Sequence, residues 1–80
     1  MEFERGQVVL ATAGREKGRL LAVTGTGENR VFVCDGKERP LEKPKAKNPR
    51  HLQRTNMTLD ESAMATNRKL KKALGELMRK

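Results

Sequence analysis

The sequence has very little aromatic material and few groups that carry out chemistry. Its 80 residues include two Phe, one His and one Cys, but no Trp and no Tyr. A chain of this length buries only about 60 % of the surface that it exposes when unfolded, so its core must be thin. A deep catalytic pocket that excludes water is difficult to build from such a core. These scarcities predict that the protein is not an enzyme.

The single Cys34 and the single His51 exclude several kinds of site. One cysteine permits no intramolecular disulfide and no cysteine-based metal cluster, and one imidazole does not make a metal site. Cys34 follows Val31, Phe32 and Val33, so we expect a reduced, packed thiol. The chain also has no nucleophile-elbow or Walker-type motif. We therefore expect no metal, no cofactor and no small-molecule substrate.

Long apolar runs are missing as well. The first five residues are mostly charged, and no apolar stretch typical of a signal peptide follows them. The longest uncharged stretch, residues 6–14, is far shorter than a membrane span. The sequence therefore predicts a cytoplasmic protein with no membrane partner.

Positive charge is what the chain has in excess. Eighteen Lys and Arg stand against ten Asp and Glu, for a formal net charge of +8. Residues 1–36 are neutral, whereas residues 37–54 hold seven basic side chains and two acidic ones, and residues 55–80 hold six and three. Such an excess favours a polyanionic partner, either nucleic acid or an anionic membrane surface. Charge that serves solubility alone is the alternative.

Short apolar segments separated by turn residues fill the first half of the chain. Asp35-Gly36 is a hairpin signal, and Pro40 confines the segment after it to an edge or a short strand. Two prolines among four basic residues predict an extended, solvated loop at residues 43–50. The expected strands are residues 7–13, 19–24, 30–35, 37–42 and 51–54, with turns at residues 14–18 and 25–29. Since there is no room for crossover helices, the pattern indicates a mainly β fold, a small barrel or sandwich.

The last third of the chain changes character. Thr58 and Glu61 have the spacing of a capping box. Apolar residues then recur at spacings near three and four, with acidic residues first and basic residues last. This pattern predicts an amphipathic helix from about Leu59 to Met78, although Gly75 weakens its last turn. We divide the chain into a β domain at residues 1–56 and a C-terminal helical segment at residues 57–80.

Residues 6–19 resemble the KOW motif of ribosomal proteins and transcription elongation factors. The motif opens with a glycine, runs through a strand, turns at a short segment with a glycine at each end, and enters a second strand. The matching residues are Gly6, Val9, Ala11, Gly14, Lys17, Gly18 and Val23. Leu21 stands where many KOW sequences have another glycine, which moves the resemblance toward the archaeal and eukaryotic large-subunit ribosomal KOW proteins.

Residues 35–45, together with His51 and Leu52, are similar to a group of small bacterial KOW-domain RNA-binding proteins. The whole resemblance covers roughly residues 4–56. It implies a small SH3-like barrel of about five short strands, here followed by the C-terminal amphipathic helix. It also implies RNA binding in a ribosomal protein or a ribosome-associated one, with neighbouring ribosomal proteins as further partners.

The charge pattern places the RNA contacts on two segments. A turn at residues 14–18 projects its cations beyond the barrel, and glycines at both ends let its backbone approach a phosphate. Lysines spaced by two in an extended loop point the same way. The predicted RNA-binding residues are Arg15, Lys17, Arg19, Lys43, Lys45, Lys47, Arg50, His51 and Arg54. Without Tyr or Trp there is no platform for base stacking, so recognition of structured RNA by shape and backbone is expected.

Several alternatives remain open at this stage. The basic loop is either a contact surface or a solvated, disordered segment. His51 either contacts RNA or is an ordinary surface residue. The helix either packs its Leu and Met face while its cations meet phosphate, or makes no RNA contact; the cations in question are Arg68, Lys69, Lys71 and Lys72. The alternative function is a protein-interaction module that docks on the transcription or translation machinery.

Overall fold

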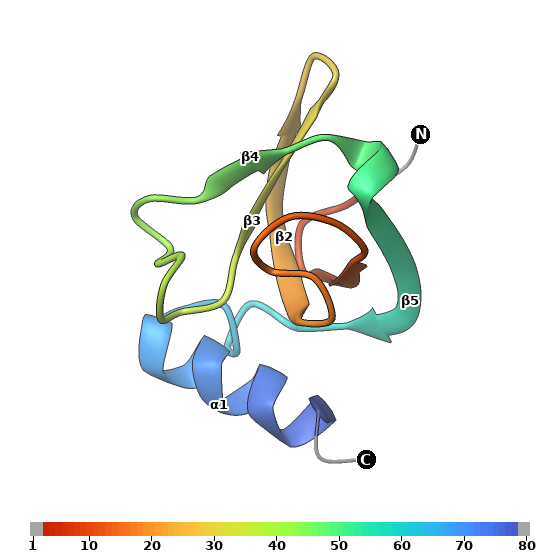
Figure 1. Cartoon of the computed structure of the whole chain (residues 1–80). Helices are drawn as coiled ribbons and strands as arrows, with labels where there is room; N and C mark the ends of the chain where they lie inside the picture. Colours follow the sequence, from red (N-terminus) through yellow and green to blue (C-terminus); the bar gives the residue numbers. More distant parts are fainter. Residues whose placement is uncertain (1–2, 79–80) are drawn as a thin grey trace.

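Five short strands form one antiparallel sheet in the computed structural model, which describes residues 3–78 (Figure 1). The strands are β1 (Gln7–Ala11), β2 (Leu20–Gly27), β3 (Arg30–Cys34), β4 (Lys45–Lys47) and β5 (Leu52–Thr58). Their order is β4-β3-β2-β1-β5, so two strands that are consecutive in sequence lie at opposite edges. The 3₁₀-helix η1 (Pro49–His51) joins them, and the sheet curls around the loop between β1 and β2 (Figure 1). The α-helix α1 (Asn67–Met78) follows.

The predicted fold class is confirmed, because the molecule is mainly β, with five short strands in a small barrel-like sheet followed by a C-terminal helix. The first three strands lie close to their predicted positions. However, β2 continues through Gly27, and only Glu28 and Asn29 remain to make the turn into β3. Asn29 has a φ of 61°, a conformation that asparagine tolerates better than most residues.

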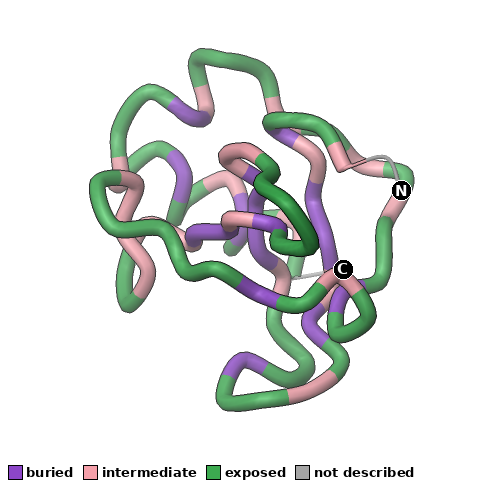
Figure 2. The backbone as a smooth tube through the Cα atoms, turned by 90° about the horizontal axis from the view of Figure 1, so that it is seen from above, coloured by how far each residue is buried: buried purple, intermediate pink, exposed green. Residues whose placement is uncertain are grey.

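The core has two layers because successive side chains of a strand point to opposite faces. The first layer lies inside the curled sheet, and Phe3 packs against it. The second lies between the outer face of β1–β3 and the residues that follow β5. The buried residues of the first layer are Val9, Ala11, Leu21, Val23, Val31, Val33 and Leu52; those of the second are Val8, Ala22, Cys34, Met64, Leu70 and Leu74. Figure 2 shows most of the buried stretches running through the middle of the molecule, with largely exposed loops around them.

Cys34 belongs to the second layer and is a free, buried cysteine, as the sequence predicts. Burial, followed by the nearby Asp35 carboxylate, raises the pKa of its thiol to about 11. Because the thiolate is the reactive form, this cysteine is a packing residue at neutral pH.

The segment between β3 and β4 corrects two predictions. Residues 37–42 form turns and no strand, because the Asp35 side chain accepts hydrogen bonds from the amides of Lys37 and Arg39, both at 2.9 Å. The Asp35-Gly36 pair therefore opens a wide loop between β3 and β4, and not the tight two-residue turn that the sequence predicts. The strand lies later, at β4, inside the segment for which an unpaired, solvated loop was expected. The short β4 pairs with β3 at the sheet edge, where prolines on either side are tolerated.

The helix begins eight residues later than predicted. Thr58 is the last residue of β5 and pairs with Gln7, so it does not act in a capping box. Residues 59–66 form a short loop and turns, in which the Asp60 carboxylate accepts from the Ala63 amide at 2.9 Å. The cap of α1 is Thr66, whose hydroxyl accepts from the Lys69 amide at 3.1 Å.

Two glycine-to-alanine changes are expected to have opposite effects on stability. Gly36 has a φ of +82°, and an added Cβ would collide with the carbonyl oxygen of Asn67 at the start of α1. Gly75 lies within α1, and an added Cβ would meet nothing within 4 Å. We expect Gly36→Ala to lower the free energy of unfolding by about 2 kcal/mol or more, and Gly75→Ala to raise it by about 0.5–1 kcal/mol. Urea denaturation checks both, and equal shifts in the same direction would contradict the docking of the loop on α1.

Candidate nucleic-acid interface

Glu16 belongs to the β1–β2 loop, residues 12–19, and its carboxylate is buried on the inner side of that loop. It is 4 % exposed although it lies between two exposed cations in sequence. Its Oε2 accepts from Arg39 Nε at 3.0 Å and lies 2.9 Å from Arg39 Nη2, while its Oε1 accepts from Lys47 Nζ at 3.2 Å. Lys47 Nζ also donates to the Ala13 carbonyl at 3.2 Å. One carboxylate thus ties together the β1–β2 loop, the loop before β4, and β4 itself.

The ion pairs of Glu16 make stability depend on pH. Burial by itself raises the pKa of the Glu16 carboxyl, but the hydrogen bonds from Arg39 and Lys47 outweigh burial and hold the pKa below its ordinary value of 4.5. A carboxyl with a lowered folded-state pKa stabilises the fold above its unfolded-state pKa. This contribution should be complete above pH 4.5 and should be lost as the pH falls through the lower folded-state value.

We therefore expect the urea midpoint of the wild type to fall as the pH is lowered below about 5, and that of Glu16→Gln to fall less. Some dependence should remain in the variant, because a hydrogen bond from Asn67 also lowers the pKa of the exposed Glu42. Parallel pH profiles for the two proteins would show that Glu16 is not the titrating group.

The inward position of Glu16 leaves the outer surface of the β1–β2 loop positive. Glu16 is the only carboxylate in this loop, and Arg15 and Lys17 are both exposed. Within residues 3–78 neither of these two cations forms an ion pair. The turn is closed by its own backbone, since the Gly18 amide donates to the Ala11 carbonyl at 2.8 Å.

The two glycines of this turn differ in what they can approach. Both have positive φ, +86° at Gly14 and +88° at Gly18. A Cβ on Gly14 would lie 3.2 Å from Lys47 Nζ, whereas one on Gly18 would meet nothing within 4 Å. Both glycines are exposed, but the Lys47 amine already lies where a side chain on Gly14 would extend, whereas the same side of Gly18 is open to a partner.

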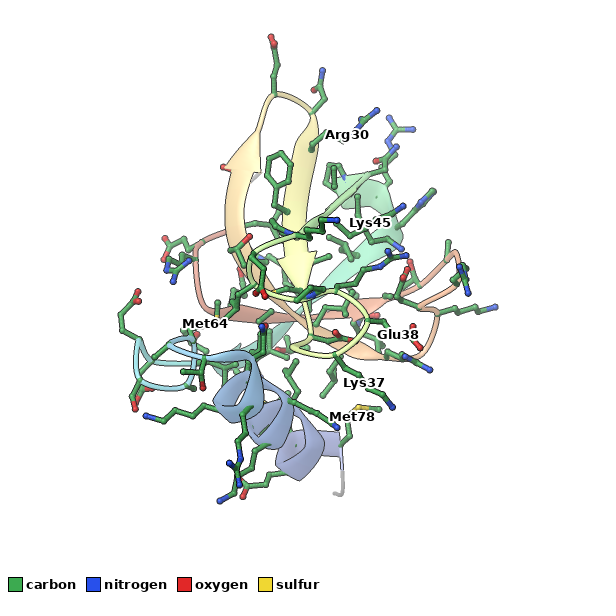
Figure 3. All side chains as sticks on the ribbon, turned by 90° about the vertical axis from the view of Figure 1, so that its left-hand side faces the viewer. Arg30, Lys37, Glu38, Lys45, Met64 and Met78 are labelled. Carbon is green, nitrogen blue, oxygen red and sulfur yellow. The ribbon has the colours of Figure 1, made fainter. Side chains whose placement is uncertain are left out.

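Five of the predicted residues lie on the β1–β2 loop itself or on the two segments bonded to it, η1 and β4, and we call them the basic rim: Arg15, Lys17, Lys45, Arg50 and His51. Two contacts bring their segments together. The Thr12 amide donates to the His51 carbonyl at 2.8 Å, which places η1 beside the loop. Lys47 joins β4 to the loop through Glu16, and Lys45 lies on the same face of β4 but is exposed (Figure 3).

The other four predicted residues lie apart from the basic rim or are engaged. Lys47 is 7 % exposed and bonded to Glu16, so it does not present its charge to a partner as its spacing predicts. Arg19 is exposed but lies 3.6 Å from Glu38. Lys43 is exposed in the loop before β4, and Arg54 lies along β5, opposite Val9.

No protein-family model matches the chain, and no curated protein matches its sequence. Among the described residues, no helix has the length and apolar character needed to cross a membrane. Residues 3–78 also contain no group of three or more His, Cys, Asp or Glu side chains that could hold a metal ion.

Two residues that the sequence patterns do not indicate belong to this region. Arg39 holds Glu16 in place from 23 residues away, and no local pattern pairs them. Arg30 is exposed at the start of β3 (Figure 3) and, with Phe3 and Pro49, lines a hollow of about 200 Å³ beside η1. The sequence places Arg30 at the start of a strand, but only the extension of β2 and the curl of the sheet bring it near Pro49.

Proposed function

We propose that this chain is an RNA-binding protein that contacts the sugar–phosphate backbone of structured RNA through the basic rim. The observation that carries the proposal is the inward position of Glu16. The loop's one negative charge is neutralised below the surface by Arg39 and Lys47, while Arg15 and Lys17 are exposed. A phosphate that approaches the loop therefore meets cations without an adjacent carboxylate on the loop.

Contact with the sugar–phosphate backbone of the RNA is favoured over stacking of aromatic side chains on its bases. The two phenylalanines are both partly buried, and the protein has no other aromatic side chain apart from His51. Stacking of successive unpaired bases needs exposed aromatic rings, so recognition by shape and phosphate contact fits these residues better.

The resemblance to KOW proteins supports a ribosomal or ribosome-associated role in the cytoplasm, without catalysis. The first glycine of the motif has a clear structural reason. Gly6 has a φ of +91°, its amide donates to the Val23 carbonyl at 2.8 Å, and its carbonyl accepts from the Leu59 amide at 2.7 Å. Gly6 therefore holds the chain before β1 against the middle of β2 and the segment after β5.

The test is RNA binding over a salt series. A fluorescently labelled hairpin from ribosomal RNA is titrated with the protein at several salt concentrations, and anisotropy gives the binding constant. Each phosphate contact should contribute about 0.7–0.9 to the slope of log K against log salt, so the four Lys and Arg side chains of the basic rim predict a slope of at least about three, to which any contact elsewhere adds. Absence of binding, or a binding constant that does not change with salt, would contradict the proposal and favour a protein-interaction module.

A second measurement addresses the ribosomal role. Sedimentation of the tagged protein through sucrose gradients should place it with ribosomal particles at low salt and free it at high salt. If the protein stays at the top of the gradient at both salt concentrations, it does not associate with ribosomal particles, and the ribosomal role is contradicted.

A further inference from the structure

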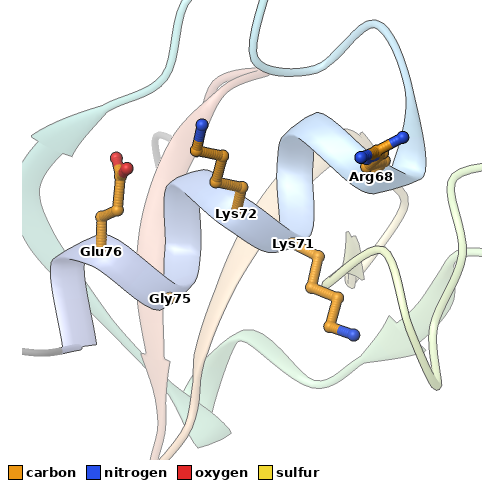
Figure 4. Close-up of a pocket in the computed structure, with 5 residues that line it drawn as sticks. All are labelled: Arg68, Lys71, Lys72, Gly75 and Glu76. Carbon is orange, nitrogen blue, oxygen red and sulfur yellow. The ribbon is translucent and has the colours of Figure 1, made fainter.

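The outward face of α1 is a second cationic surface. Arg68, Lys71 and Lys72 line a hollow of about 400 Å³ on this face, with Gly75 and Glu76 (Figure 4). The three cations are exposed, and within residues 3–78 they form no ion pair. Glu76 is the one carboxylate of the helix. This face therefore attracts anions.

The apolar face of α1 is already used by the barrel. Leu70 and Leu74 are buried against the outer face of the sheet together with Met64. A helix that lies in a membrane surface, or docks in a groove of another protein, needs a free apolar face. Among the described residues Met78 is the one large hydrophobic side chain that is exposed. The helix can therefore offer a partner its charge and very little apolar area.

Lys71 connects this surface to the β1–β2 loop. It also lines a second hollow, of about 280 Å³, to which Arg19 and Lys37 contribute. Figure 4 shows Lys71 pointing away from Lys72 and Glu76, toward a different side of the helix. Arg19 and Lys37 thus lie between the β1–β2 loop and the flank of α1, and they outnumber the one carboxylate that lines this hollow, Asp35; Glu38 lies 3.6 Å from Arg19.

We propose that the outward face of α1 is a second phosphate-binding surface, and that one structured RNA contacts both it and the basic rim. The proposal rests on the proposed function, because it assigns the same kind of partner to a second part of the molecule. The continuity at Lys71 and the absence of a free apolar face favour an RNA backbone over a lipid surface or a partner helix.

The experiment compares two lysines of the same helix. At 3.6 residues per turn, Lys69 and Lys71 lie on opposite flanks of α1, and only Lys71 lines the two hollows. Lys69→Ala and Lys71→Ala each remove one charge and favour the helical conformation. With the labelled ribosomal hairpin, Lys71→Ala should lower the salt slope by about 0.7–0.9, and Lys69→Ala should leave it unchanged. The triple variant Arg68→Ala, Lys71→Ala, Lys72→Ala should lower the slope by about two.

The outcomes separate this inference from the function on which it rests. If the wild type does not bind the hairpin, both proposals fail. If the wild type binds it and the triple variant keeps the same affinity and slope, only the surface on α1 is refuted. Equal losses for Lys69→Ala and Lys71→Ala would show an effect of net charge and no localised surface. Binding to phosphatidylserine vesicles that the triple variant loses, with RNA binding intact, would assign this face to a membrane.

Discussion

Glu16→Gln is expected to lower the free energy of unfolding by about 3 kcal/mol or more. The change leaves Lys47, which is 7 % exposed, without an anionic partner. It also removes the charge that faces the partly buried Arg39. Loss of one member of a buried ion pair typically costs about 3–5 kcal/mol, because the remaining charge is held out of water. A domain of this size is stable by only about 5 kcal/mol, so the variant should retain about 2 kcal/mol or less at room temperature.

The matched control is Glu38→Gln, which makes the same chemical change in an exposed ion pair. Glu38 lies 3.6 Å from Arg19, and both side chains are about half exposed. Exposed pairs of this kind contribute about 0–1 kcal/mol. Urea denaturation followed by circular dichroism should therefore give a midpoint near that of the wild type for Glu38→Gln and a much lower midpoint for Glu16→Gln. Similar midpoints for the two variants would mean that the buried network contributes no more than a surface pair.

The same network changes how the lysines of the basic segment can be tested. Lys43, Lys45 and Lys47 have the spacing of a single cationic track, but replacing Lys47 with Ala would leave Glu16 to Arg39 alone. A loss of RNA binding in a variant that includes Lys47→Ala would therefore mix a fold defect with a lost contact. Lys43→Ala and Lys45→Ala, both at exposed positions, avoid this difficulty.

The sequence predicts well what depends on local patterns. The β-branched and apolar runs place β1–β3 close to their true positions, and the leucine spacing predicts a helix that covers the residues of α1, Asn67–Met78. It fails where a contact between distant residues decides the conformation. The strand expected at residues 37–42 is a loop because it is held by Asp35 and by Asn67, whose Oδ1 accepts from the Leu41 amide at 2.7 Å. The helix does not begin at Leu59 because the chain there still pairs with the segment before β1, through the Leu59 amide and the Gly6 carbonyl.

In the candidate site, too, the sequence predicts what depends on local patterns and misses what depends on contacts between distant residues. Exposure of a lysine or arginine is the usual outcome, and eight of the nine predicted residues are exposed. The exception, Lys47, depends on a carboxylate 31 residues away. Nothing in the local sequence distinguishes Glu16, which turns inward, from Glu38, which stays at the surface. The partners of Glu16 come from two other segments, so only the folded chain identifies it as the support of the β1–β2 loop.

The double variant Arg15→Ala, Lys17→Ala is expected to weaken binding to the ribosomal hairpin by about 25- to 60-fold at 0.1 M salt. Both side chains are exposed on the β1–β2 loop and form no ion pair within residues 3–78. If each side chain contacts one phosphate, the salt slope of the double variant should be lower by about 1.4–1.8. The electrostatic part of binding vanishes near 1 M salt, so at 0.1 M each unit of slope corresponds to about a tenfold change in the binding constant. Anisotropy titrations over the salt series measure the affinity and the slope together.

The control for this prediction exchanges the two cations, as Arg15→Lys with Lys17→Arg, and keeps the charge of the loop. Counterion release depends on the number of neutralised phosphates, so this variant should keep the wild-type salt slope. Thermal unfolding should be nearly unchanged in both variants, because Glu16 and its two partners are untouched. If the alanine variant binds as tightly as the wild type, the outward charge of this loop has no role in RNA binding. If the exchanged variant loses as much affinity as the alanine variant, the geometry of particular hydrogen bonds, and not charge, determines recognition at this loop.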